Sequence, residues 1–493
     1  MSVGTKAGQG SLVKRNVILA AALALMLGSR LVPVPEGLNQ DSMQVLGIFL
    51  GSILMWMGIS IDWPSIITMV ALGLMPVFGF GEVFRSAFGA DTFPFLVFTF
   101  MLTYPLGQTN FVRRCAIAFI TNRVAVRGPW WFLGFLFAAV TFMGCFISPS
   151  VLFVAFLPFL EDIYRVLGLR KGSPVAEVMM LGVAFCTGIS SGMTPIGHVW
   201  PTLAMGTLKS ITGIELNQLQ YMAMGVPTGL LCIALMLLMF RLFYRPGDIG
   251  AIDPAGALAL RESLPRADRR EKLTLAAVGI TIFLWVAPSL TQNVFPGFYS
   301  LTKSWTTAMP PMVGCILLSV ATVEGKPVMD FKEATSKGVL WASPIMCAST
   351  LALGSCLTSE KVGIIDWLSQ KLGPMTASLP ALALVAFFVG WTLLQTNFAS
   401  NIVTTTVVSS IAIPIAFSMP AGSISVAAVA ALIGMGAGFA FMTPPGMTAV
   451  NGVAAASGWT SARSMFLWGL FTALISFVVL TFLGYPLGSM MMG

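Results

Sequence analysis

Charged residues are scarce in this chain, and their scarcity excludes most classes of soluble protein. Only 9% of the 493 residues are Asp, Glu, Lys or Arg, whereas 56% are hydrophobic, and the mean hydropathy is +0.88. Soluble domains carry about 25% charged residues. Numerous apolar stretches approach the roughly 20 residues that span a bilayer. The composition therefore predicts an all-α polytopic membrane protein that is embedded in the lipid bilayer.

The chain also has little of what an enzyme or a metal centre needs. It contains a single histidine, and its seven cysteines lie mostly in apolar segments without metal-ligand spacing. We therefore predict no zinc site and no disulfide. An intramembrane enzyme would need a metal or an acid–base set at depth, such as His-Glu-x-x-His or paired aspartates, and the sequence has neither. The sequence thus favours a protein that is not an enzyme.

Membrane topology explains the net charge of +8 better than binding to nucleic acid. The basic residues are spread over short loops, and cytoplasmic loops of membrane proteins carry an excess of Lys and Arg. With the N-terminus inside, most basic residues fall on the cytoplasmic side. The exceptions are Arg30, Arg85, Lys209, Lys303, Lys361 and Lys371. We predict no nucleic-acid partner, a bacterial inner-membrane location, a cytoplasmic N-terminus and a C-terminus outside.

Apolar stretches and basic loops divide the chain into two halves of similar order. We expect an N-terminal tail and first helix (1–40), a first repeat (41–245), a cytoplasmic linker (246–272) and a second repeat (273–493). Each repeat has five crossings and a re-entrant hairpin, and an odd number of crossings inverts the second repeat. About 11 transmembrane helices plus two re-entrant hairpins in two inverted repeats result. The expected spans are 16–34, 42–60, 64–80, 92–112, 175–207, 219–243, 273–290, 305–323, 338–357, 423–457 and 464–487, with hairpins over 130–162 and 377–418 and an interfacial helix over 326–337.

A run of polar, uncharged residues interrupts the second half. Residues 395–406 read Gln-Thr-Asn-Phe-Ala-Ser-Asn-Ile-Val-Thr-Thr-Thr, and residues 372–462 contain no charged side chain. Non-helical polar backbone at membrane depth is tolerated only where it is buried in protein or lines a cavity. We therefore expect the tip of a re-entrant hairpin, with Ser400 and Asn401 in its break. Thr443-Pro444 then reads as the start of a half-helix, with Thr as N-cap and Pro at the first position.

The first half contains a counterpart of each feature. Ser148-Pro149-Ser150 begins 252 positions before Ser400, and Thr194-Pro195 begins 249 positions before Thr443. Ser and Thr are common in membrane helices, where they bond to the backbone, and packing alone would explain one such cluster. Packing alone does not predict that both features recur at nearly the same offset in the two halves. Paired broken segments in two halves point to the binding site of a transporter.

Such a site binds an anion without a basic side chain. Each break creates a half-helix N-terminus, whose free N–H groups favour an anion, and the preceding half-helix ends in free carbonyls, which suit sodium. The acidic residues lie in loops or at span ends, which argues against a proton relay. His198 lies within a span, where a lone histidine is more often a packing residue, and a role with substrate or protons stays open. A channel is a further alternative, although paired breaks fit alternating access better.

These motifs make the chain similar to the divalent anion/sodium symporter family of carboxylate and sulfate transporters. The resemblance begins at residues 35–38 and extends to the last helix, and it rests on the second hairpin tip and on the Thr-Pro pairs of both halves. The substrate site expected from the tips, the breaks and this resemblance comprises Ser148, Ser150, Thr194, Pro195, His198, Ser400, Asn401, Ile402, Thr443 and Pro444. The expected sodium site comprises Thr396, Ala399, Asn401 and Met442.

The first tip departs from the family pattern. Pro149 stands where the family has Asn, and Gly144 stands where it often has a hydroxyl residue. Pro149 offers neither an amide oxygen nor an N–H, so we expect one retained sodium site, on the second side. The resemblance implies a secondary active transporter of small dianions, above all C4- or C5-dicarboxylates, that works as a homodimer by an elevator motion. A sodium-independent dicarboxylate exchanger and a sulfate or other inorganic-anion transporter are the alternatives.

Overall fold

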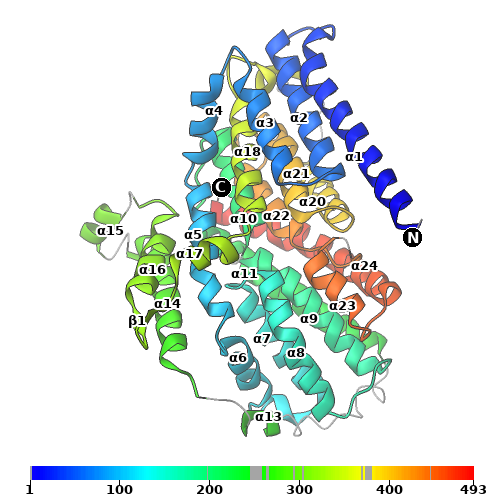
Figure 1. Cartoon of the computed structure of the whole chain (residues 1–493), viewed down its shortest axis with the longest axis vertical. Helices are drawn as coiled ribbons and strands as arrows, with labels where there is room; N and C mark the ends of the chain where they lie inside the picture. The colour runs from blue at the N-terminus through cyan, green and yellow to red at the C-terminus, as the bar shows by residue number, and fades with distance from the viewer. Residues whose placement is uncertain are drawn as a thin grey trace.

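The computed structural model folds the chain almost entirely into α-helices (Figure 1). It describes residues 3–196, 198–244, 258–262, 266–291, 295–302, 305–367, 370–371, 380–444 and 446–492. Within these ranges the only strands are β1 (Thr322–Val323) and β2 (Lys326–Pro327), which pair antiparallel. The all-α class expected from the composition is confirmed. Much of the predicted linker 246–272 and the first residues of the hairpin 377–418 lie outside the described residues.

The helices form two series, one on each side of the linker. The first series comprises α1 (Val3–Gly28), η1 (Ser29–Leu31), α2 (Gln40–Gly58), α3 (Trp63–Gly73), α4 (Gly79–Phe88), α5 (Thr92–Gly107), α6 (Phe111–Ile120), η2 (Ala125–Arg127), α7 (Pro129–Gly144), α8 (Pro149–Val166), α9 (Pro174–Met193), α10 (Val199–Thr212) and α11 (Gln218–Phe243). After α13 (Ala259–Glu262), the second series comprises α14 (Arg269–Thr291), α15 (Pro296–Thr302), α16 (Met309–Val320), α17 (Phe331–Glu333), η4 (Ala334–Gly338), α18 (Ala342–Leu357), α20 (Ala381–Thr396), α21 (Asn401–Phe417), α22 (Val426–Ala437), η5 (Thr448–Gly452), α23 (Val453–Ala456), α24 (Ala462–Val479), η6 (Leu480–Gly484) and α25 (Tyr485–Met492).

Local sequence explains where several of these helices begin. Asn217 accepts a hydrogen bond from the backbone N–H of Gln220, and the Gln220 side chain accepts one from the backbone of Asn217. This reciprocal pair is a capping box, and it starts α11. The helices α7, α8 and α9 each carry proline near their first position, where the missing N–H costs no helical hydrogen bond.

The helix bounds of the two series repeat at nearly constant spacing. The helices α7 and α20 both have 16 residues and start 252 positions apart, and α8 and α21 start at the same offset. The helices α5 and α18 also have 16 residues each and start 250 positions apart. An internal repeat predicts this regularity in the helices themselves as well as in the polar motifs.

In the described part, six helices are long and apolar enough to cross a membrane, and two bent helix pairs raise that number to eight. One pair is α4 with α5, bent by 41°, and the other joins the segment Phe331–Gly338 to α18, bent by 73°. Six further apolar helices have only 10–17 residues, and they include α7, α20 and α21 of the hairpins. Short helices are what re-entrant hairpins and broken spans require. The count of about eleven crossings therefore stays a prediction.

One expected element is wrong. Residues 326–337 do not form one interfacial helix, because β2 opens this segment and α17 and η4 follow it. The turn from β1 to β2 passes through Glu324 and Gly325, both at positive φ (53° and 76°). A tight two-residue hairpin turn requires positive φ at both of its central residues. Residues in this conformation cannot belong to a right-handed helix.

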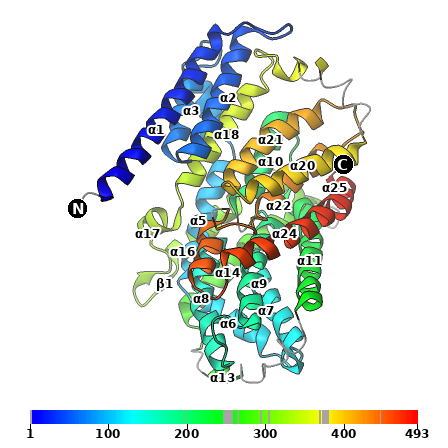
Figure 2. The ribbon, with the colours of Figure 1, turned by 90° about the vertical axis from the view of Figure 1, so that its right-hand side faces the viewer.

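Two helical hairpins approach the middle of the molecule from opposite ends. The hairpin α7–α8 lies in the lower part of Figure 1 and α20–α21 in the upper part, and Figure 2 agrees. Two broken spans lie between them, α9 with α10 and α22 with η5. The hairpin α7–α8 packs against α9 and η5, whereas α20–α21 packs against α22 and α10. The first hairpin therefore contacts α9, the first part of the broken span in its own half, and η5, the second part of the other broken span. The second hairpin contacts α22 of its own half and α10 of the other.

Glycines allow the two broken spans to cross closely. A Cβ on Gly188 would lie 2.9 Å from the Gly438 carbonyl oxygen, and one on Gly438 would lie 2.7 Å from Trp200 Nε1. A Cβ on Gly192 would lie 2.6 Å from the Met435 carbonyl oxygen. Any larger residue at these positions would force the backbones apart, because packed interiors have no room for an added methyl group.

Candidate functional site

Asn397 ties the second hairpin tip to the second broken span. Its Oδ1 accepts hydrogen bonds from the backbone N–H groups of Phe441 and Met442, at 2.7 and 2.6 Å. Its Nδ2 donates to the carbonyls of Leu393 and Phe439, at 2.7 and 3.2 Å. The side chain is fully buried. The amide therefore replaces helical hydrogen bonds that the backbone of the break has lost.

The sequence motifs do not single out Asn397. The signal that marks it is its amide type inside a charge-free apolar segment, where an unpaired amide would be costly. Because of that cost, the Asn397 amide must have hydrogen-bond partners, but the sequence does not show which backbone groups they are.

The break in the second span is longer than predicted. The helix α22 ends at Ala437, and helical structure resumes only in η5, at Thr448. The prediction that Thr443 caps a helix with Pro444 at its first position is therefore wrong. The Thr443 hydroxyl instead donates to the Asn397 carbonyl oxygen, and Asn451 Nδ2 donates to the carbonyls of Ala440 and Thr443 at 2.7 and 3.1 Å. Contacts across the break, which local propensity does not report, hold Thr443 in place.

Asn401 carries the clearest sign of a binding site. It is the first residue of α21 and is only 5% exposed, yet its Oδ1 and Nδ2 atoms have no hydrogen-bond partner. Leaving a buried amide unpaired costs about 1–3 kcal/mol, so such an atom indicates a missing ligand. Ser400 precedes it as an exposed N-cap whose side chain makes no capping bond, and Ile402 is buried beside it.

The residues expected to hold a cation lie around this same tip. The Thr396 hydroxyl donates to the Ala437 carbonyl oxygen at 2.5 Å, Ala399 is half-buried, and the N–H of Met442 is held by Asn397. Residues 438–442 have left the helix, so their carbonyls make no helical hydrogen bonds. Carbonyl, hydroxyl and amide oxygens are the ligands that a hard cation prefers, so the chemistry around the tip is compatible with the expected sodium site.

Gly446 lies where the chain returns close to the second hairpin tip. A Cβ at this position would lie 3.0 Å from the carbonyl oxygens of both Thr396 and Asn397. The chain therefore returns close to the tip carbonyls at this position, and a side chain would crowd them.

The first hairpin tip has the same backbone plan. The helix α8 begins at Pro149, with buried Ser148 as its N-cap and half-buried Ser150 in its first turn. The Thr194 hydroxyl donates to the Cys145 carbonyl oxygen at 2.5 Å, as the Thr443 hydroxyl does to that of Asn397. Buried Thr194 and half-buried Thr443 thus each anchor a break to a tip.

Thr194-Pro195 does not start a helix, contrary to the prediction. The helix α10 begins at Val199, and its N-cap is His198, whose Nδ1 accepts from the Val199 N–H at 2.8 Å. The Pro195 carbonyl accepts from the Thr202 hydroxyl at 3.0 Å, which folds the break onto α10. His198 therefore has a structural role, and its half-buried ring also stacks on Trp200.

Within the described part, the site contains no buried ionisable acid or base. The one buried Asp, Glu, Lys or Arg residue there is Glu271, which pairs with Arg114 at 2.8 Å. An anion at the tips would therefore meet hydroxyls, amides and backbone N–H groups rather than a fixed positive charge.

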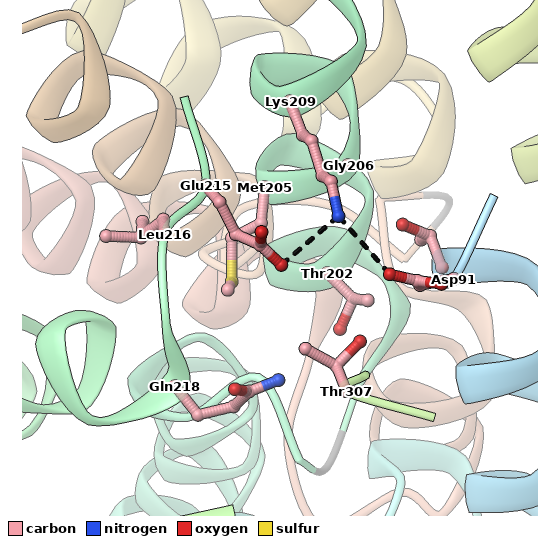
Figure 3. A pocket seen from close by; sticks show the side chains of 10 residues that line it. Asp91, Thr202, Met205, Gly206, Lys209, Glu215, Leu216, Gln218 and Thr307 are labelled. Carbon is pink, nitrogen blue, oxygen red and sulfur yellow. Dashed lines mark hydrogen bonds and ion pairs between the residues drawn. The ribbon is translucent and has the colours of Figure 1, made fainter. Parts of the chain in front are cut away.

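A second pocket, at the far end of α10, does not suit a dianion. Lys209 lies 3.2 Å from Asp91 and 3.1 Å from Glu215, and all three line the pocket (Figure 3). Two carboxylates face one ammonium group here, so the local charge is negative. A second negative ligand would be repelled.

Apolar spans, re-entrant hairpins and central helix breaks together define a multi-pass integral membrane transport protein. A sequence model of the family described as the sodium:sulfate symporter transmembrane region matches residues 13–493. This protein belongs to that family. The resemblance that rested on the hairpin motifs is confirmed. The protein is a transporter of this family and not an enzyme.

Named relatives and a solved structure agree with this assignment. The sodium-dependent dicarboxylate transporter SdcS of Staphylococcus saprophyticus is 24% identical over 465 residues, covering 92% of this chain and 87% of that protein. The chloroplastic dicarboxylate transporter 1 of Arabidopsis thaliana is 25% identical over 390 residues, covering 74% and 62%. The crystal structure of the YdaH transporter of Alcanivorax borkumensis matches at a TM-score of 0.54 and 13% identity, covering 91% and 98%, so the fold is shared.

Proposed function

We propose that this protein is a secondary active transporter of small dianions, most of all C4- or C5-dicarboxylates, coupled to sodium through one site at the second hairpin tip. The observation that carries the proposal is the buried amide of Asn401, which has no partner at the start of α21. In this proposal its Nδ2 group donates to a carboxylate of the substrate and its Oδ1 is a ligand of the cation.

Sodium coupling follows from the neutrality of the site. A dianion loses hydration on entering the membrane, and no Lys or Arg among the buried residues of the described part compensates for that loss. A sodium ion beside Thr396 and Asn401 supplies the missing positive charge. Binding of each ion then favours binding of the other, which is the thermodynamic basis of symport.

The repeated helix spacing and the opposed hairpins support a moving unit built from both halves. In this proposal the repeats 41–245 and 273–493 are inverted, and the hairpins with the broken spans move as an elevator against a scaffold that includes α5. The protein works as a homodimer in a bacterial inner membrane, with its N-terminus in the cytoplasm and its C-terminus outside. Gly107 of α5 fits a sliding contact, because a Cβ there would lie 2.9 Å from Val151 of α8.

Counterflow in proteoliposomes tests the proposed function. Vesicles loaded with succinate should take up labelled succinate in the presence of sodium, with a Hill coefficient for sodium of about one because one cation site is retained. Sulfate should compete weakly. Exchange of succinate without any sodium requirement would overturn the symport proposal in favour of an exchanger, and uptake of sulfate but not of succinate would overturn the dicarboxylate proposal.

A further inference from the structure

A cavity of about 200 Å³ opens beside the first hairpin tip. Residues of α5, including Thr103 and Tyr104, form one wall, and Ser148 with its neighbours on α8 forms another. The third wall consists of Lys337, Gly338 and Leu340. Gly338 brings this wall close to α5, because a Cβ there would lie 2.8 Å from the Cβ of Tyr104.

Among the residues that line this cavity in the described part, Lys337 alone is charged. Its ammonium group lies 3.0 Å from Glu333 Oε1, the same oxygen that accepts the Tyr104 hydroxyl at 3.0 Å. The Lys337 side chain is 67% exposed. An exposed ion pair of this kind contributes little to stability, so a competing anion displaces Glu333 at low cost.

The surroundings of the cavity favour an anion. Arg270 donates to Gln108, which also lines the cavity, at 3.1 Å. Two basic groups, Arg270 and Lys337, therefore lie close to the carboxylate of Glu333 beside the cavity. Arg270 belongs to the described end of the predicted linker 246–272, and we call the side of the protein on which it lies the linker face. The cavity extends from Lys337 to Ser148.

We infer that Lys337 and Tyr104 form an anion-capture site through which the dianion reaches the first hairpin tip from the linker face. A carboxylate of the substrate takes the place of Glu333, accepting from the Lys337 ammonium group and from the Tyr104 hydroxyl. The anion then passes to the hydroxyls of Ser148 and Ser150. This inference rests on the proposed function and adds to it the route of entry and the residue that first recognises the charge.

A purely structural role makes a different prediction. If the Lys337–Glu333–Tyr104 contacts only fasten η4 to α5, loss of either charged partner should weaken the protein and its transport in the same direction. Capture instead predicts opposite effects, because Glu333 competes with the substrate for Lys337.

The test measures initial rates of labelled succinate transport from each membrane face in oriented vesicles. From the linker face, Lys337→Ala should raise KM by about three- to five-fold with little change in kcat, as expected for the loss of one screened ion pair. Glu333→Gln should lower that KM, and Lys337→Arg should restore it. Lys332→Ala is the matched control, since Lys332 is exposed on the preceding turn but does not line the cavity.

Added salt should reduce the difference between the wild type and Lys337→Ala, because ionic strength screens exposed charges. An unchanged linker-face KM in Lys337→Ala, or an equal rise from both faces, would overturn the capture site while leaving the proposed function intact. A wild-type protein that transports neither succinate nor sulfate would overturn both.

Discussion

The two hairpin tips share a backbone plan, a phenylalanine and a serine, but they differ at the positions equivalent to Thr396, Asn397 and Asn401. The helix before the break ends at Gly144 in the first tip and at Thr396 in the second, and the next helix begins five residues later in both. In each tip, the carbonyl of the following residue, Cys145 or Asn397, accepts the hydroxyl of the threonine in the adjacent break. The two tips therefore make the same hydrogen bond although the residue at this position differs.

The side chain at this shared position explains why the broken spans differ. In the second half, α22 ends six residues before Thr443, and the Asn397 amide holds two of the released N–H groups. In the first half, α9 remains helical to Met193, immediately before Thr194. Cys145 has no amide with which to replace helical bonds. Unwound carbonyls suitable for a cation are consequently concentrated beside the second tip.

Removal of the Asn397 amide should have the largest effect on the difference between the two tips. Asn397→Ala should abolish transport and lower the free energy of unfolding by about 3 kcal/mol or more, because it leaves two buried N–H groups without an acceptor. Cys145→Ala, at the equivalent position, should be nearly silent because only its backbone carbonyl is used. Thermal stability by size-exclusion chromatography, together with sodium-driven uptake, measures both effects. Equal tolerance of the two substitutions would contradict the role assigned to Asn397.

A second comparison sets Asn401 against Pro149, since each residue opens the second helix of its hairpin. Asn401→Ala should reduce sodium-driven uptake by about ten- to hundred-fold, the loss expected for one hydrogen bond to a charged ligand. Stability without ligand should stay level or rise, because the amide is buried without partners. Pro149→Ala should keep most of the transport. A fall in ligand-free stability of Asn401→Ala would show that the amide is used for packing, and the proposed site would be lost.

The smallest expected effect concerns Gly144, which is equivalent to Thr396. A Cβ at Gly144 would overlap the Ser190 hydroxyl and lie 2.9 Å from the Ser190 Cβ. Gly144→Ser should therefore destabilise the protein by about 1–3 kcal/mol through overpacking. The double variant Gly144→Ser/Ser190→Gly should recover most of that loss, as contacting residues are expected to couple.

Gly134→Ser on the same helix is the control, since a Cβ there would make an ordinary contact of 3.5 Å with Leu237. Melting temperatures of the wild type, the single variants Gly144→Ser and Ser190→Gly, the double variant and this control measure the coupling. Additive losses in the double variant would mean that Ser190 does not occupy the space beside Gly144.

The amino-acid sequence by itself determined that this is an all-α membrane protein with paired tips and breaks. Low charge and apolar runs near 20 residues favour spanning helices, in which backbone groups in lipid are satisfied within the segment. Ser and Thr are common in membrane helices, but the pairing of Ser148 with Ser400 and of Thr194 with Thr443 in the two halves predicts irregular backbone. Helix ends at Gly144, Thr396, Pro149 and Asn401 agree with that interpretation.

Only the tertiary structure decided how the breaks are held. Local propensity favours a helix start at each Thr-Pro pair, yet both threonine hydroxyls bond to tip carbonyls more than forty residues away in the chain. The same holds for Asn397, whose partners Phe441 and Met442 lie across the break, and for Ser190, which occupies the space beside Gly144. These contacts depend on how the hairpins and the broken spans pack against each other. A sequence pattern along the chain does not show which distant residues come into contact.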